Sequence, residues 1–168
     1  MLNTIDLFAG CGGLTDGFKK SGHFKMLAAV EWDIDAHATL VNRLMHAHGY
    51  SDAAERCILA DIQDTNSLIY GNNNNDKFPL HGGLESLVKE QKVDVIIGGP
   101  PCQGYSLTGT RDADDDRNKL YNAMFVGIDA FKPKAVVIEN VRGMATLYGG
   151  AAKSQVTKMF ESLGYDVQ

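Results

Sequence analysis

Residues 5–15 read Ile-Asp-Leu-Phe-Ala-Gly-Cys-Gly-Gly-Leu-Thr, and this stretch indicates an α/β arrangement most clearly. Asn3 to Phe8 form a short apolar run typical of a buried strand, and a segment with helical spacing begins at Gly13. Three of the four residues Gly10 to Gly13 are glycines, so the backbone can approach a ligand there and the N–H groups of the helix start point toward it. A strand, a glycine turn and a helix in this order predict a cofactor-binding turn rather than a merely tight connection.

The glycine pattern argues against two common nucleotide sites. Thr15 stands where G-x-G-x-x-G needs its third glycine, and the Lys-Ser/Thr of a P-loop is missing. The second apolar run ends in Glu31-Trp32-Asp33, 18 residues beyond Gly13, where a carboxylate commonly holds a ribose diol. Trp32, the only tryptophan, is suited to stacking on a purine, and Asp61 offers an acceptor for an adenine amino group. Together these residues predict an adenosine site.

Apolar runs alternate with helical segments along the chain, which predicts an α/β fold with a Rossmann-like, doubly wound and mostly parallel sheet. The expected strands are Asn3 to Phe8, Lys25 to Val30, Cys57 to Ala60, Val93 to Ile97 and Ala135 to Glu139. The expected helices are Gly13 to Ser21, Ile34 to His46, Gly83 to Gln91, Leu120 to Phe131 and Ala151 to Leu163.

Two further stretches complete the predicted organisation. Ile69 to Gly83 is polar and rich in asparagine and glycine, so we expect a mobile surface loop without chemistry. Tyr165 to Gln168 resemble the opening of another strand, so we expect the sheet to be incomplete at its C-terminal end.

The overall composition narrows the functional classes. With 168 residues, of which 44% are hydrophobic and 22% charged, the chain fits one globular domain. No apolar run approaches the roughly 18–20 residues of a membrane span and no basic leader begins the chain, so we expect a soluble, cytoplasmic protein without membrane contact. Its cysteines, Cys11, Cys57 and Cys102, lack CxxC spacing, which argues against disulfides and a metal site. The net charge of -5 has the wrong sign for a self-sufficient nucleic-acid binder.

A cysteine lies in a second glycine-containing turn, after the fourth expected strand. The run Gly98-Gly99-Pro100-Pro101 turns sharply and restricts φ, so Cys102 is presented at the carboxyl edge of the sheet, where ligands of open α/β sheets bind. The next strand ends in Glu139-Asn140-Val141, which brings a carboxyl group to the same edge. A cysteine nucleophile needs a partner that activates the electrophile. The pattern therefore favours a catalytic Cys102 with Glu139 over a buried structural thiol beside a salt-bridging carboxylate.

These motifs resemble those of the cytosine-C5 DNA methyltransferases over essentially the whole chain. Five segments match in order and spacing, namely Asp6 to Gly13, Glu31 to Asp33, Gly98 to Ser106, Asp116 to Leu120 and Glu139 to Val141. The resemblance implies that residues 1–168 are the catalytic-cysteine part of such an enzyme, with the fold of methyltransferases that use S-adenosylmethionine and a place in restriction–modification.

By the same resemblance, the cofactor is S-adenosylmethionine. Glu31 would take the ribose hydroxyls and Asp61 the adenine amino group. Trp32 and Leu120 would cover the two faces of the adenine. The full set of implied cofactor-binding residues is Phe8, Gly10, Cys11, Gly13, Glu31, Trp32, Asp61, Ile62, Pro101 and Leu120.

The resemblance also implies a mechanism on double-stranded DNA. Cys102 would add to C6 of a flipped-out cytosine while Glu139 hydrogen-bonds to or protonates N3, and C5 would then take the methyl group before elimination frees the enzyme. The loop from Gly104 to Arg117 resembles the family's lid over that base, although its aspartates make it net acidic. The implied substrate-binding residues are Gln103, Ser106, Arg117 and Asn140.

The regions that the chain lacks indicate a partner, and two alternative functions stay open. The family's later arginine motif, target-recognition region and closing C-terminal helix are absent from these 168 residues, so a C-terminal recognition region or a complementary subunit is the expected partner. One alternative is a transfer-RNA cytosine-C5 methyltransferase, although Gly104 to Ser106 looks more like the DNA group. The other is a non-catalytic cofactor-binding subunit, against which the intact Cys102 and Glu139 argue.

Overall fold

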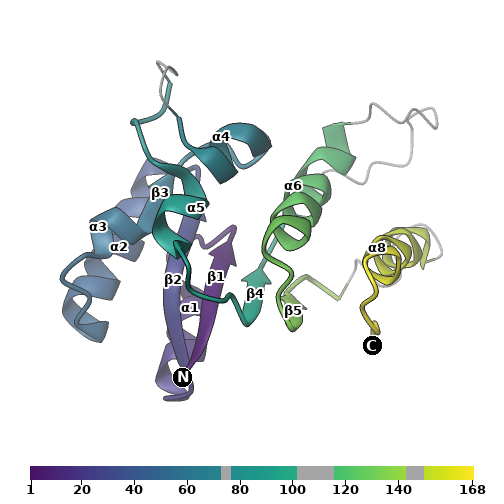
Figure 1. The fold of residues 1–168 in the computed structure, drawn as a ribbon, viewed down its shortest axis with the longest axis horizontal. Coiled ribbons are helices and arrows are strands. Elements are labelled where there is room, and N and C mark those ends of the chain that lie inside the picture. The colour runs from purple at the N-terminus through teal and green to yellow at the C-terminus, as the bar shows by residue number, and fades with distance from the viewer. Residues whose placement is uncertain (73–76, 102–115, 143–149) are drawn as a thin grey trace.

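A computed structural model describes residues 1–72, 77–101, 116–142 and 150–168, with the backbone alone for residues 116–119, 151 and 152. At its centre lies a parallel sheet in the order β3-β2-β1-β4-β5 (Figure 1). The strands are β1 (Leu2–Leu7), β2 (Phe24–Glu31), β3 (Cys57–Leu59), β4 (Val95–Gly98) and β5 (Ala135–Ile138). The doubly wound α/β fold predicted from the sequence is confirmed.

Helices cover both faces of this sheet (Figure 1). One face carries α1 (Gly13–Lys20), α2 (Ile34–His48) and α3 (Ala53–Arg56). The other carries α4 (Thr65–Tyr70), α5 (Gly83–Val88), α6 (Asp116–Phe131) and α8 (Ala151–Ser162). In the part of the chain that the structure describes, no helix combines the length and apolarity needed to cross a membrane.

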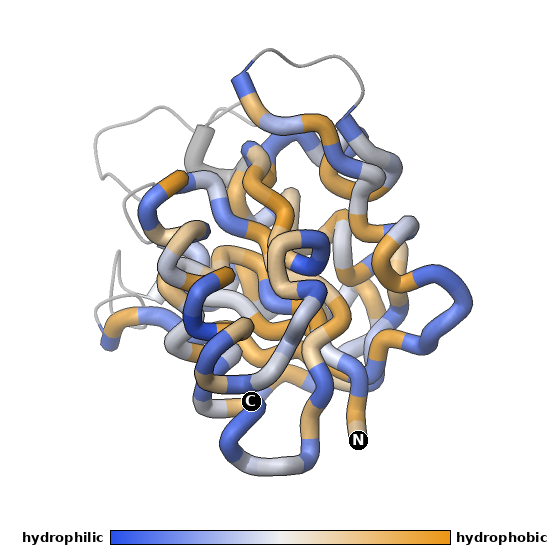
Figure 2. Tube along the Cα trace, turned by 90° about the vertical axis from the view of Figure 1, so that its left-hand side faces the viewer, coloured by the Kyte–Doolittle hydropathy of each residue, from blue (hydrophilic) through white to orange (hydrophobic). Residues whose placement is uncertain are grey.

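Both faces of β1 are buried, including the face that carries polar residues of the motif. Ile5 and Leu7 are fully buried in the larger core, against α4, α5 and α6. The alternate residues Thr4 and Asp6 are also buried, at 3% and 1% exposure. A parallel sheet covered on both sides favours nearly continuous apolar runs, and Figure 2 shows such segments running through the middle of the molecule with hydrophilic turns outside. A carboxyl group inside this sheet is therefore an exception that needs a partner.

The five strands and five helices predicted between Asn3 and Leu163 all exist, with ends that differ by a few residues, but two helices were missed. The short α3 and α4 were not predicted. Asp64 caps α4 because its Oδ1 accepts the N–H of Ser67 at 3.1 Å. The expectation of a loop from Ile69 to Gly83 is wrong at its start, since the buried Ile69 belongs to α4. Asn72 and His81 form an antiparallel bridge, while residues 73–76 lie outside the description.

The expectation of a strand at Tyr165 to Gln168 is wrong. These residues form no strand; instead the N–H of Tyr165 donates to the carbonyl of Phe160 at 3.1 Å and its hydroxyl to the carbonyl of Pro133 at 2.7 Å. A strand assignment requires a ladder of hydrogen bonds with a neighbour. Among the described residues β5 is paired with β4 alone, so the C-terminal residues do not extend the sheet beyond β5.

Candidate functional site

The carboxyl ends of the parallel strands meet at one edge of the sheet and enclose a pocket of about 400 Å³. This is where ligands of open α/β sheets bind, next to the point between β1 and β4 at which the strand order reverses. Its lining includes Phe8 after β1, Glu31 at the end of β2, Asp61 after β3 and Gly99 after β4. Residues distant in sequence thus converge because their strands are parallel.

Eight of the ten residues predicted to bind the cofactor line this pocket, namely Phe8, Gly10, Glu31, Trp32, Asp61, Ile62, Pro101 and Leu120. Cys11 and Gly13 do not: Cys11 is exposed beside the pocket and Gly13 begins α1. Four lining residues were missed, and each adjoins a predicted one in the sequence or lies two positions from it. They are Val30, Ala60, Gln63 and Gly99. The role of the lining residues in binding stays a prediction.

The glycine turn has a backbone that few residues tolerate. Phe8, Gly10 and Gly12 have φ angles of 69°, 54° and 86°. For phenylalanine this left-handed conformation is uncommon and marks a strained position of the kind found at ligand sites. A Cβ on Gly12 would lie 2.6 Å from Cδ1 of Leu40 in α2, so glycine is required there both by φ and by the close approach of the two helices.

Glu31 ties the glycine turn to the end of β2. Its side chain is buried at 7% exposure; Oε2 accepts the N–H of Gly10 at 2.7 Å, and Oε1 accepts those of Trp32 at 3.0 Å and Asp33 at 2.9 Å. A carboxylate offers about four acceptor positions. Three are engaged by the protein, so Glu31 is first a brace for the pocket wall and retains room for about one ligand hydroxyl.

The remaining walls combine apolar surface with a carboxylate. Trp32 is 68% exposed at the rim, whereas Ile62 is 5% exposed behind it. Asp61 Oδ1 accepts the N–H of Gln63 at 3.0 Å, which holds the turn after β3 and leaves its other oxygen available to a donor. Apolar walls with a few oriented polar groups are typical of sites for small organic ligands.

Asp6, which the sequence showed only as part of a motif, connects the pocket wall to α1. Its Oδ2 accepts the hydroxyl of Thr15 at 2.5 Å, and its Oδ1 is buried with no hydrogen-bond partner among the described residues. Burial raises the pKa of Asp6 to about 7, against the lowering effect of the Thr15 hydrogen bonds and with a smaller raising effect from Glu31. The carboxyl group under the glycine turn therefore exchanges its proton near neutral pH.

The proposed catalytic carboxylate follows β5 directly. The N–H of Glu139 donates to the carbonyl of Gly98 at 2.9 Å, and a Cβ on Gly99 would lie 3.2 Å from Glu139 Oε2. The exposed Glu139 side chain thus lies against the turn that leads to Cys102. Cys102 itself lies outside the described residues, so its proximity to Glu139 stays a prediction.

The described thiols differ in chemistry. Burial raises the pKa of Cys57 to about 12, with a smaller contribution from Asp6, so this thiol stays protonated at neutral pH and is a poor nucleophile. Cys11 is an exposed free thiol. Neither lines the pocket.

The predicted substrate residues are placed only in part. Gln103 and Ser106 lie outside the description, and Arg117 is placed in α6 by its backbone alone. Asn140 is described, and its amide contacts Pro100, Tyr121 and Val141. Its contacts are therefore with the protein, and binding of substrate by Asn140 stays a prediction.

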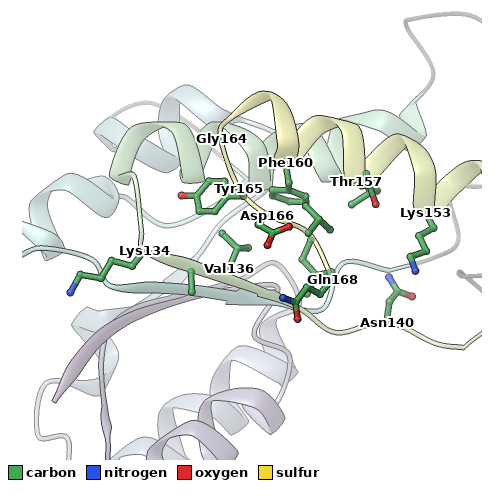
Figure 3. A pocket seen from close by; sticks show the side chains of 14 residues that line it. Lys134, Val136, Asn140, Lys153, Thr157, Phe160, Gly164, Tyr165, Asp166 and Gln168 are labelled. Carbon is green, nitrogen blue, oxygen red and sulfur yellow. The ribbon is translucent and has the colours of Figure 1, made fainter.

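A second hollow, a groove of about 510 Å³, lies between β5, α8 and the C-terminal residues (Figure 3). Figure 3 shows Phe160 and Tyr165 on one side and Val136 of β5 on the other. Of the predicted site residues that the structure describes, Asn140 is the one that lines this groove. The groove beside β5 therefore has a mixed apolar and polar lining, and the described catalytic candidate Glu139 is not part of it.

Comparison with known proteins gives a consistent result. A sequence model of the family described as C-5 cytosine-specific DNA methylase matches residues 2–168. Two similar proteins are the type II methyltransferases M.AgeI of Thalassovita gelatinovora and M.DdeI of Desulfomicrobium norvegicum, each 36% identical over 98% and 99% of the chain, respectively. Among solved structures, a prophage-encoded E. coli protein described as a DNA modification methyltransferase superposes with a TM-score of 0.63 and 28% identity over 96% of the chain.

The chain spans only part of each of these proteins. It covers 33% of M.AgeI, 35% of M.DdeI and 38% of the E. coli chain. The similarity therefore concerns the sheet and pocket described above.

Proposed function

Because this chain belongs to the C-5 cytosine-specific DNA methylase family, we propose that it is the cofactor-binding and catalytic-cysteine part of an enzyme that methylates C5 of cytosine in DNA. The observation that carries the proposal is the pocket of about 400 Å³ at the carboxyl edge, which gathers residues following β1, β2, β3 and β4 beside Glu139. A binding pocket and a carboxylate on one edge are the arrangement that a group transfer between two ligands requires.

The pocket fits S-adenosylmethionine as cofactor. Its volume lies in the about 300–1,000 Å³ range of small-molecule sites. Phe8, Ile62 and Leu120 offer apolar surface to an adenine ring. Glu31 and Asp61 offer acceptors to hydroxyl and amino groups. When bound, S-adenosylmethionine supplies an electrophilic methyl group.

Cys102 and Glu139 would make the cytosine nucleophilic. The Cys102 thiolate adds to C6, forming an S–C6 bond, and the electron pair of the C5=C6 bond moves toward N3. Glu139 hydrogen-bonds to or protonates N3 and stabilises that charge, which leaves C5 as an enamine carbon able to attack a methyl donor. After methylation, C5 loses its proton to a base, the S–C6 bond breaks, and the thiolate returns. The target base must leave the duplex stack to reach this edge.

Sequence recognition and most phosphate contacts would come from further polypeptide. The chain has a net charge of -5, whereas affinity for a phosphate backbone comes mainly from lysine and arginine. It also spans about a third of M.AgeI and M.DdeI. The half-exposed apolar residues of β5 beside the groove of about 510 Å³ support packing of another segment at that edge.

Trapping on 5-fluorocytosine tests this proposal. A duplex with 5-fluorocytosine at the target is incubated with S-adenosylmethionine and the chain, together with a polypeptide that supplies the remaining region of the relatives. Fluorine at C5 cannot leave as a proton does, so elimination stalls and the DNA stays attached. We expect peptide mapping to find the adduct at Cys102 and to find none without S-adenosylmethionine.

Variants make this test specific. Cys102→Ser abolishes the adduct, because a serine hydroxyl is far less ionised at neutral pH. Cys11→Ser and Cys57→Ser retain it. Glu139→Gln slows trapping by about 10²- to 10⁴-fold, the usual contribution of a general acid. Attachment at Cys11 or Cys57, full trapping by Cys102→Ser, or transfer to transfer RNA in preference to duplex DNA would overturn the proposal.

A further inference from the structure

The side-chain amide of Asn140 joins three segments of the proposed active site. Its Nδ2 donates to the carbonyl of Pro100 at 2.9 Å and to the hydroxyl oxygen of Tyr121 at 3.1 Å. Its Oδ1 accepts the N–H of Val141 at 2.8 Å. The residue after Glu139 thus connects the end of β5, the turn after β4 and helix α6.

The partners fix the orientation of this amide. The Pro100 carbonyl can only accept a hydrogen bond and the Val141 N–H can only donate one, so the nitrogen of Asn140 must face Pro100. Its second N–H then points to Tyr121. The Tyr121 side chain is 3% exposed and packs in the larger core, so its hydroxyl is held on a rigid ring. Tyr121 therefore offers a fixed acceptor that sets the direction in which Asn140 points.

The orientation of the Pro100 carbonyl sets the direction of the backbone that follows it. Neither Pro100 nor Pro101 has an N–H, so carbonyl oxygens are the hydrogen-bonding groups of these two residues. Pro100 is buried, and its φ is restricted by the ring. Holding its carbonyl fixes the remaining rotation, ψ, and hence the direction in which the chain continues toward Cys102.

We propose that Tyr121 is a positioning residue for the methyl-transfer reaction, which acts through Asn140 on the Pro100 carbonyl and so orients the backbone leading to Cys102. This inference rests on the proposed function. Among the described residues Tyr121 is not part of the pocket lining, and its hydroxyl contacts Asn140, through which we infer that it acts.

Tyr121→Phe is the variant that tests this role, since it removes the hydroxyl and keeps the buried ring. Tyr50→Phe is its matched control. Tyr50 is 9% exposed in the smaller core, and its hydroxyl accepts the N–H of Met26 at 3.1 Å on the far side of the sheet. Both variants lose one buried acceptor for an N–H group, so both proteins should lose similar stability.

The variants are compared in the enzyme reconstituted from this chain and a polypeptide that supplies the remaining region of the relatives. The measurements are the trapping rate on 5-fluorocytosine at saturating DNA and the kcat and KM of methyl transfer. We expect Tyr121→Phe to lower kcat and the trapping rate about fivefold to tenfold, the effect of one hydrogen bond in the transition state, with the KM for S-adenosylmethionine unchanged. Tyr50→Phe should alter neither. In an Asn140→Ala background, Tyr121→Phe should have little further effect on kcat.

The outcomes separate this inference from the proposed function. If the unaltered protein forms no adduct at Cys102, the proposed function fails and the inference with it. If it forms the adduct and Tyr121→Phe reacts as fast as the unaltered protein, or loses no more kcat than Tyr50→Phe, Tyr121 has a structural role and the inference alone is wrong. An equal effect of Tyr121→Phe with and without Asn140 would overturn the proposed route.

Discussion

Asp6 shows how a single residue links burial to pH. Burial raises its pKa to about 7 from the ordinary value of 3.8, so the folded protein binds this proton more tightly than the unfolded chain. The stability contributed by the neutral carboxyl group is present at low pH and is lost as the pH rises from about 4 to about 7. We expect Asp6→Asn, which keeps the acceptor for Thr15, to lack this loss.

Urea unfolding at several pH values measures the difference between Asp6→Asn and the unaltered protein. The variant should gain roughly 2–4 kcal/mol relative to the parent between pH 4 and pH 7, and nothing further above that range. His81, whose pKa is lowered mainly by burial, titrates in part of the same window, but it does so in both proteins and cancels in the difference. A difference that stays flat from pH 4 to pH 8 would contradict a buried titrating Asp6.

At the scale of the element, β4 depends on the absence of a side chain at Gly98. A Cβ there would lie 2.3 Å from the carbonyl oxygen of Leu7 in β1, a backbone atom that cannot move without disturbing the sheet. We expect Gly98→Ala to destabilise the fold by about 1–3 kcal/mol, as overpacking of a core does. Thermal or urea unfolding measures the effect.

Gly17→Ala provides the comparison within the same chain. Gly17 lies inside α1, and a Cβ on it meets nothing within 4 Å. The added methyl group should therefore stabilise the protein by about 0.5–1 kcal/mol, since alanine loses less backbone entropy in a helix than glycine. Equal stability of Gly98→Ala and the parent would contradict the close packing of β4 against the Leu7 carbonyl in β1.

At the scale of the whole molecule, charge argues that the chain needs a partner region to act on DNA. It carries 21 acidic and 16 basic residues, excluding histidine. We expect the purified 168-residue chain to transfer negligible methyl label to duplex DNA, and a polypeptide supplying the remaining region of the relatives to restore transfer. Methyl transfer by the mixture should weaken as the salt concentration rises, because lysine and arginine residues of the added polypeptide would make the phosphate contacts and salt weakens such contacts. Robust sequence-specific methylation by the chain alone would contradict this prediction.

Local sequence patterns predicted much of the candidate site. Apolar runs predicted every strand, because a strand buried on both faces cannot accommodate frequent polar residues. Once the strands are parallel, residues at their ends must share an edge, so Phe8, Glu31 and Asp61 converge around one pocket. The short α4 was missed because its few residues combine a polar start with only two buried side chains, Leu68 and Ile69.

The sequence was enough to predict the five strands, most of the helices and the family motifs that follow the strands, since these depend on neighbours along the chain. The contacts and the burial of those groups came from the folded structure. The raised pKa of Asp6 arises from atoms packed around it, and the bond from Asn140 to Pro100 joins residues 40 positions apart. Cys11 belongs to the glycine motif, yet the turn leaves its side chain outside the pocket lining. Burial, side-chain direction and long-range hydrogen bonds are properties of the packed chain, because each depends on several segments that meet only after folding.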